Sequence, residues 1–234
     1  MSTDRPELTG VEGVPETFLS EALLATLPEN LAPAPWTCSL SALVWGHRGG
    51  VPATQALPPL LRRDHKGLAV VGGMVRYQDT PVGAYDEVLG LVATREGRRP
   101  FGSVAFMSVD SPASLVGGRT NWAMPKALGA FKGEVGAGET FTASSDDGGT
   151  WEVSATPRVF GPAIPVATKG QAQQQFPGGR VGASRLRGKG RVRLAVVTVS
   201  VRSDGPLPTW LKPGRHLGAL VEEATFSLEE PTFR

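Results

Sequence analysis

The chain has 234 residues, 40% hydrophobic and 20% charged, so it can bury a core and is long enough for one large or two small domains. Its 24 lysines and arginines nearly balance its 22 acidic residues, which excludes a strongly basic nucleic-acid-binding protein. A single cysteine, Cys38, excludes an internal disulfide. We find neither a signal peptide nor an apolar run long enough to span a membrane, and we expect a cytoplasmic protein without membrane or nucleic-acid partners.

In chain order, residues 1–14 are expected to be a flexible lead-in, and residues 15–234 a single domain. Apolar residues at helical spacing predict a helix over 15–27, and Pro59 favours a short helix within 56–63. Alternation and turn residues predict strands over 36–45, 67–77, 85–94, 103–109, 129–135, 140–144, 150–155, 191–201 and 217–228.

Three further segments are interpreted from their composition. Residues 146–149 predict a hairpin turn, and 171–179 a polar loop. The basic cluster is interpreted as the solvent faces of two strands around a turn; it consists of Arg185, Arg187, Lys189, Arg191 and Arg193. Many strands with few helices indicate a mostly antiparallel barrel-like or sandwich fold.

Common catalytic patterns are missing. The three histidines, His47, His65 and His216, are scattered without ligand spacing, which argues against a metal site or a histidine-based triad. No glycine-rich phosphate loop is found. We therefore expect no metal and no organic cofactor.

One segment, residues 117–131 (GGRTNWAMPKALGAF), is dense in chemically distinctive residues. Lys126 lies there among apolar neighbours. Burial would disfavour its ammonium form, lower its pKa and leave an amine able to attack a carbonyl. The alternative is a surface lysine on a short helical turn, with its stem across Trp122.

Two motifs keep a fixed spacing. Residues 118–120 (GRT) precede 124–129 (MPKALG), and 83–87 (GAYDE) lie upstream; the strand-like segment 106–116 lies between them. Over about residues 67–131 the chain resembles the acetoacetate decarboxylase family. That resemblance implies a mainly β (α+β) fold, an antiparallel β-barrel or cone with few peripheral helices. It also implies a Schiff base on Lys126, Glu87 as acid/base, decarboxylation of a 3-oxo acid such as acetoacetate, no cofactor, and a homo-oligomer.

This sequence departs from the family pattern at three places. The family's second lysine is Ala127 here, and its other active-site glutamate falls on or near Gly72. Residues 36–45 contain no match for the family's N-terminal substrate arginine. These departures leave the amine chemistry intact but question the fit to acetoacetate.

Each remaining candidate has a structural alternative. Glu87 is either the acid/base or a strand residue paired with an arginine. Arg119 is either a clamp for a substrate carboxylate or part of an ion pair, for example with Asp110. Asn121 either binds a carbonyl oxygen or caps a turn. Tyr85 and Trp122 are expected in the wall of a substrate pocket or in the core.

Three functions follow in order of preference. The first is a Schiff-base lyase acting on a small oxo-acid, with Arg119 holding the carboxylate. The second uses the same lysine for aldol addition, dehydration or cyclisation in specialised metabolism. The third is a non-catalytic protein that binds a small ligand, with Lys126 as a cation at the mouth of its pocket.

Overall fold

The computed structural model describes residues 5–146 and 150–233. The strands are β1 (Trp36–Arg48), β2 (Ala69–Asp79), β3 (Tyr85–Glu96), β4 (Arg99–Val109), β5 (Lys126–Gly133), β6 (Phe141–Ser145), β7 (Trp151–Phe176), β8 (Arg180–Ser203), β9 (Gly214–Leu228) and β10 (Thr232–Phe233). The helices are α1 (Pro6–Thr9), the 3-10 turn η1 (Pro15–Thr17), α2 (Glu21–Leu24), α3 (Val51–Ala56), α4 (Pro59–Asp64), α5 (Pro112–Trp122) and α6 (Leu207–Trp210).

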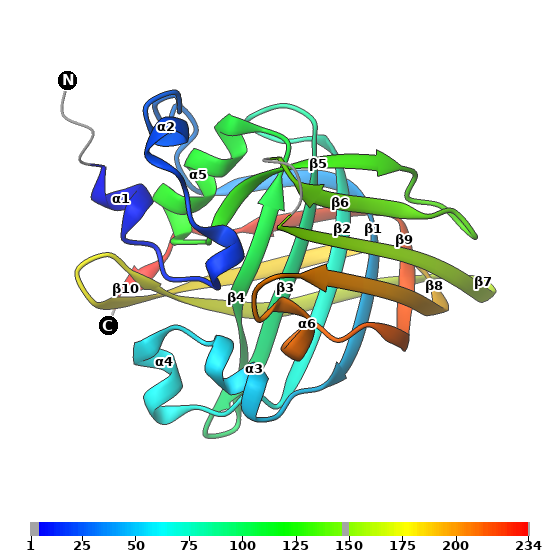
Figure 1. The fold of residues 1–234 in the computed structure, drawn as a ribbon. Coiled ribbons are helices and arrows are strands. Elements are labelled where there is room, and N and C mark those ends of the chain that lie inside the picture. The colour runs from blue at the N-terminus through cyan, green and yellow to red at the C-terminus, as the bar shows by residue number, and fades with distance from the viewer. Residues whose placement is uncertain (1–4, 147–149, 234) are drawn as a thin grey trace.

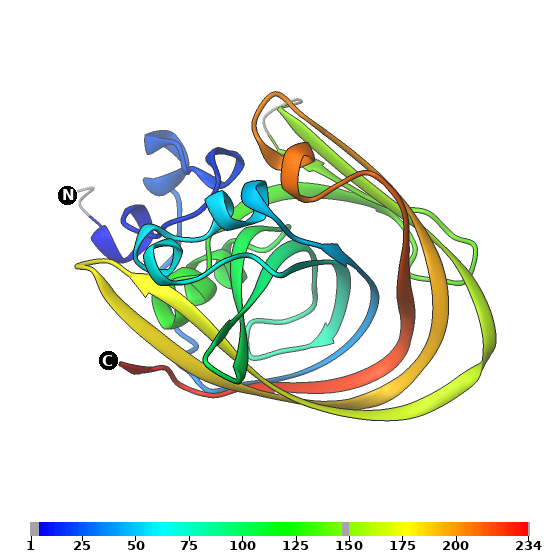
Figure 2. The ribbon, with the colours of Figure 1, turned by 90° about the horizontal axis from the view of Figure 1, so that it is seen from below.

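The strands form one sheet that closes on itself. Its order is β10-β8-β7-β6-β5-β4-β3-β2-β1-β9, and β9 also pairs with β8, which completes a ring. Neighbours are antiparallel except where β4 meets β5 and β7. The short helices lie at the periphery (Figure 1), and β7, β8 and β9 sweep around the strands β1 to β4 (Figure 2). The expected mainly β fold with few peripheral helices is confirmed.

Alternation along the strands separates two apolar clusters. The first cluster contains Trp45, Met74, Phe106 and other fully buried side chains. The second contains Trp36 and lies on the side of the strands where Lys126 is found. Each cluster takes alternate residues of the same strands because successive side chains point to opposite faces. In the part of the chain that the structure describes, no helix has the length and apolar character needed to cross a membrane.

The N-terminal predictions are wrong in two respects. Residues 15–27 do not form one helix but a 3-10 turn and α2, separated by an extended stretch. Residues 5–14 are not a loose lead-in, because Leu8 is fully buried and the main chain of Val14 donates to that of Ala105 at 3.0 Å. The apolar residues whose spacing suggested one helix over 15–27 instead lie on backbone that is largely irregular.

Three further interpretations need correction. Residues 171–176 are the end of β7 rather than a loop, and Arg185 to Arg193 lie on one strand, β8, with no turn between them. Residues 110–116 are not strand, because β4 ends at Val109 and α5 begins at Pro112. The expected turn at 146–149 lies largely outside the described residues.

Candidate active site

Lys126 is the first residue of β5, which follows helix α5 after a short connection of three residues. The helix ends at Trp122 and is capped by Ala123, which has a left-handed φ of 50° and whose N–H donates to the carbonyl of Arg119. The N–H of Met124 donates to the carbonyl of Gly118 at 3.1 Å. This capping pattern turns the chain sharply into β5, so Lys126 faces the helix that precedes it.

The glycine of the GRT motif has a steric role. A Cβ at Gly118 would lie 2.6 Å from Cδ and Cε of Lys126. Only glycine therefore allows the lysine stem to pass over α5 at this depth.

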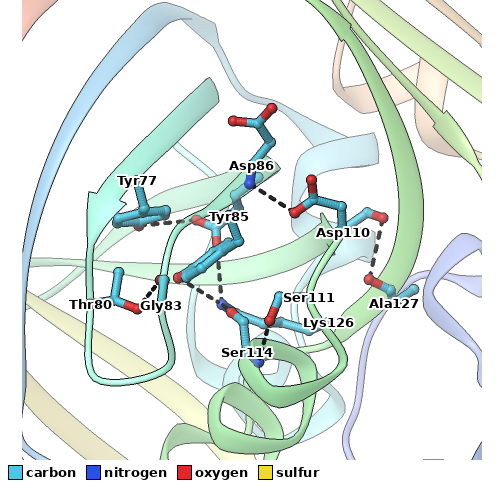
Figure 3. Close-up of polar contacts among 12 residues, drawn as sticks. Tyr77, Thr80, Gly83, Tyr85, Asp86, Asp110, Ser111, Ser114, Lys126 and Ala127 are labelled. Carbon is cyan, nitrogen blue, oxygen red and sulfur yellow. Dashed lines mark hydrogen bonds and ion pairs between the residues drawn. The ribbon is translucent and has the colours of Figure 1, made fainter.

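Glu87 and Tyr85 come from the hairpin that joins β2 to β3. Gly83 adopts a φ of 87°, and its carbonyl accepts from the hydroxyl of Thr80 at 2.6 Å, which closes the turn. Two residues apart on one strand, Tyr85 and Glu87 point to the same face. The GAYDE motif thus combines a turn glycine with Tyr85, which points toward Lys126 in Figure 3, and Glu87, which forms an ion pair with Lys126.

The amine of Lys126 has three polar neighbours. Its Nζ lies 2.8 Å from Oε2 of Glu87, 2.8 Å from Oγ of Ser114 and 3.5 Å from the hydroxyl of Tyr85 (Figure 3). The hydroxyl of Tyr77 donates to the other carboxylate oxygen of Glu87 at 3.3 Å. Lys126 and Glu87 are 3% and 2% exposed, so this ion pair is shielded from water.

The charge state of Lys126 differs from the sequence-based expectation. Burial lowers its pKa, but the carboxylate of Glu87, together with the Tyr85 hydroxyl, raises it more, and the pKa lies above the usual lysine value. The pair is therefore an ammonium facing a carboxylate. A free amine arises when the proton passes to Glu87, rather than by loss to solvent.

The other groups near the pair are neutral at pH 7. Burial raises the pKa of Tyr85 to about 12 and that of Tyr77 well above its usual value. Burial likewise raises the pKa of the Cys38 thiol to about 11. The two phenols therefore keep their protons, and Lys126 and Glu87 carry the charge at this end of the cavity.

A cavity of about 540 Å³ opens beside the pair, between β1 to β3 and β7 to β9. Its lining is mostly aliphatic and aromatic, and it includes Tyr85, Glu87, Trp122 and Lys126. Trp122 packs edge-on against Trp36, also a lining residue, with ring centroids 5.2 Å apart. Tyr85 and Trp122 are thus wall residues of the cavity.

Arg119 lies elsewhere, which argues against its expected role as a carboxylate clamp. Its Nε, Nη1 and Nη2 donate to the main-chain carbonyls of Lys126, Leu8 and Thr17 at 2.6, 2.6 and 2.5 Å. It is absent from the cavity lining, and burial lowers its pKa to about 10. Asp110 is not its partner either, because that carboxylate accepts from the N–H of Asp86. Arg119 fastens the N-terminal segment and β5 to α5.

Asn121 is also structural in its contacts. Its Nδ2 donates to the carbonyl of Ala32 at 2.8 Å, and its Oδ1 accepts from Asn30 at 2.8 Å. It does not line the cavity. The amide joins α5 to the segment that leads into β1, which is neither the expected contact with a substrate carbonyl nor the cap of a turn.

Ser114 and Tyr77 were missed by the sequence analysis. Ser114 was hidden because residues 106–116 were interpreted as strand. Ser111 accepts a hydrogen bond from the N–H of Ser114, and Pro112 occupies the first turn of α5. Serine followed by proline is a helix-start signal, which would have placed Ser114 on the first turn. Tyr77 carries no such signal, since only strand pairing brings it opposite Tyr85.

The departures from the family pattern have structural correlates. A Cβ at Gly72 would lie 2.2 Å from the ring of Trp45, so no side chain fits there. Ala127 is buried. Lys126 and Glu87 therefore have neither a second glutamate at position 72 nor a second lysine at position 127 beside them. Among the described residues, no cluster of three or more histidine, cysteine or acidic side chains is arranged to hold a metal ion.

Comparison with solved structures supports the fold. An acetoacetate decarboxylase aligns over 100% of this chain and 98% of its own, with 14% identity and a TM-score of 0.66. The enduracididine biosynthesis enzyme MppR, complexed with pyruvate, covers 87% and 91%, with 16% identity and a TM-score of 0.64. An acetoacetate decarboxylase-like enzyme from Sphingomonas wittichii RW1 covers 87% and 94%, with 17% identity and a TM-score of 0.61.

A search among curated proteins finds no match. The sequence pattern described as Acetoacetate decarboxylase (ADC) matches residues 52–214, which include both motifs and the whole of α5. This match covers well over half of the chain. The chain therefore belongs to the acetoacetate decarboxylase family and is an enzyme of the lyase type.

Proposed function

We propose that this enzyme forms a Schiff base between Lys126 and a carbonyl substrate, and that the reaction to test first is decarboxylation of a 3-oxo acid. The observation that carries the proposal is the buried amine of Lys126, 2.8 Å from the carboxylate of Glu87 and beside a mostly apolar cavity. In such surroundings a proton moves between two groups without charge separation, which provides both a nucleophile and an acid.

In the proposed reaction, Lys126 first gives a proton to Glu87 and adds as a neutral amine to the keto carbon. Glu87 returns the proton to the departing hydroxyl, so that water leaves and an iminium remains. Carbon dioxide departs as the electrons of the breaking carbon–carbon bond move into the iminium, giving an enamine. Glu87, reprotonated from solvent, protonates the enamine carbon, and water releases the ketone. The net reaction consumes one proton.

Ser114 and the tyrosines have supporting roles in this proposal. Ser114 accepts from Lys126 at 2.8 Å and thereby fixes the direction of Nζ, while Tyr77 holds the second carboxylate oxygen of Glu87. Holding both partners of a proton transfer in place reduces the reorganisation that the reaction requires.

The test is reduction of the imine with borohydride. The protein is incubated with acetoacetate or pyruvate, reduced, and analysed by intact mass and by the mass of its peptides. We expect an adduct on Lys126, none in Lys126→Met, and an unchanged yield in Lys132→Met, which removes an exposed lysine of the same strand. Folded protein that yields no adduct with any carbonyl compound would refute the proposal in favour of a ligand-binding protein.

A second candidate keeps the iminium but not the loss of carbon dioxide. Among the residues that the structure describes, no arginine lines the cavity to receive a carboxylate. One MppR structure is complexed with the condensation product of pyruvate and imidazole 4-carboxaldehyde. Aldol addition or dehydration at Lys126 would be indicated by a product from pyruvate and an aldehyde without release of carbon dioxide. The homo-oligomer and the cytoplasmic location stay predictions.

A further inference from the structure

The cavity has a polar end and an apolar end. Cys38, Tyr77, Tyr85 and Glu87 surround Lys126 at the first. Along β3 the lining continues from Glu87 to Leu89 and Leu91, a distance of about 13 Å for four strand residues.

Neighbouring strands continue the apolar end. Leu91 of β3 is paired with Val71 of β2, and Val71 in turn is paired with a residue of β1 on its other side. Val44, Val192 and Val221 also line this part of the cavity. The apolar end is therefore built from aliphatic side chains of several strands around the ring.

Fixed charge at the cavity is confined to the polar end. Among the lining residues, Glu87, Lys126 and Lys189 bear charges. Lys189 is exposed, and it alternates along β8 with the lining residues Gly188 and Gly190, so its side chain belongs to the outer face. The charges of Glu87 and Lys126 cancel. Such a cavity offers a substrate much apolar surface and no cation dedicated to a carboxylate.

Size leads to the same conclusion. A volume of about 540 Å³ lies within the range of cavities that enclose drug-sized ligands. A molecule as small as acetoacetate would leave the apolar end filled with water that makes few hydrogen bonds. A longer hydrocarbon chain would displace that water and gain binding free energy in proportion to its buried surface.

We propose that the substrate is a carbonyl compound with an extended hydrocarbon chain: its keto carbon reacts at Lys126 and its chain lies between β1 to β3 and β7 to β9. This inference rests on the proposed function. For decarboxylation, the substrate is a medium-chain 3-oxo acid, which takes up one proton and yields a methyl ketone and carbon dioxide. The lysine and glutamate act as described above, and the apolar end provides the specificity.

Imine trapping across a series of ketones tests the inference. Acetone, butanone, methyl pentyl ketone and methyl nonyl ketone are compared by the concentration that gives half-maximal reduction onto Lys126. We expect this concentration to fall by up to about fourfold for each added methylene group until the cavity is full. A medium-chain 3-oxo acid should likewise exceed acetoacetate in kcat/KM for release of carbon dioxide.

Two alanine substitutions provide a matched pair. Ala224 lines the cavity on β9 opposite Gly190, whereas Ala167 is exposed on β7 and does not line it. In Ala224→Phe the advantage of the longer ketones should shrink at least tenfold, while acetone is still trapped. Ala167→Phe should behave like the unaltered protein.

The outcomes separate this inference from the function on which it rests. Trapping on Lys126 that is equal for all ketones, or best for acetone and acetoacetate, would overturn the substrate assignment and leave the Schiff base standing. Absence of trapping with every ketone would overturn both. A chain-length effect that Ala224→Phe and Ala167→Phe leave unchanged would place the hydrocarbon chain outside this cavity and contradict the inference.

Discussion

Lys126 and Glu87 are ionised in a position where either charge alone would be costly. Desolvation favours neutral forms, whereas an opposite charge at 2.8 Å favours the ionised ones. In Lys126 desolvation is the largest single effect, but the carboxylate of Glu87 and the hydroxyl of Tyr85 together outweigh it, so its pKa is raised. Activation therefore depends on Glu87 as proton acceptor, and burial alone is an insufficient account of the reactive amine.

Glu87→Gln tests this dependence through pH. The substitution removes the carboxylate that raises the pKa of Lys126 and leaves burial, which lowers it. We expect the pH at which half of Lys126 reacts in imine trapping to move down, because the free amine then forms at lower pH. Turnover should fall by about a hundredfold or more, since the acid/base is gone.

Measurement of trapping yield from pH 5 to 11, with Glu134→Gln as a control on an exposed carboxylate, would check the direction. An unchanged or higher midpoint in Glu87→Gln would mean that Glu87 does not set the charge of Lys126.

The sequence could predict the residues whose spacing is local. Lys126 and Glu87 follow from two short motifs, and the structure brings them together. For Arg119 the sequence offered a substrate clamp or an ion pair, and neither was found, because two of its partners, the carbonyls of Leu8 and Thr17, lie over a hundred residues away in the chain. Every residue has a main-chain carbonyl, so a contact with a distant one does not depend on the residue type and cannot be read from the sequence.

Helix α5 positions the site through its glycines and its arginine. Gly118→Ala would place a Cβ 2.6 Å from the stem of Lys126 and displace the amine from Glu87. We expect trapping and turnover to fall by about a hundredfold, as for a displacement of about 1 Å. Gly170→Ala, where the nearest contact of the new Cβ is 3.8 Å, is the matched control.

Circular dichroism and urea unfolding would show whether the Gly118→Ala protein stays folded. Alanine favours a helix over glycine by about 1 kcal/mol, so a loss of activity without loss of helix would locate the effect in the side chain of Lys126. Full activity in this variant would contradict the packing described here.

Arg119→Met distinguishes a structural from a substrate-binding arginine. Three main-chain carbonyls would lose their donor, so the free energy of unfolding should drop by about 3 kcal/mol, against little change for the exposed Arg98→Met. Trapping per folded molecule should fall equally, or not at all, for acetone and acetoacetate. A loss of trapping that affects acetoacetate but not acetone would instead support Arg119 as the residue that binds the substrate carboxylate.

Among the elements, the buried strands β2 and β3 were predictable and the long hairpin of β7 and β8 was not. Alternation located β2 and β3 to within two residues. In β7 and β8, many residues are exposed on both faces, and glycine, proline and glutamine interrupt the pattern. These two strands are held mainly by their pairing with each other, which does not require an alternating pattern. Their sequences therefore resemble those of loops.

At the scale of the molecule, the N-terminal segment belongs to the folded body. Leu8 has no exposed surface, and its carbonyl accepts from Arg119. Leu8→Ala should lower the free energy of unfolding by about 3 kcal/mol, as expected for a buried leucine. Leu31→Ala, at a side chain that is 88% exposed, should change it little. Equal urea midpoints for the two variants would show that the segment is dispensable for stability.

One edge of β7 that is left unpaired affects how copies of the chain can meet. From residue 158 to 170, β7 is paired with β8 on one side, and no pairing on the other side is described. A bare strand edge invites the same edge of another molecule and thereby aggregation. Pro162 and Pro165 lie in this stretch and have no N–H to offer. These two prolines therefore lower the tendency of the free edge of β7 to pair with another copy of the chain.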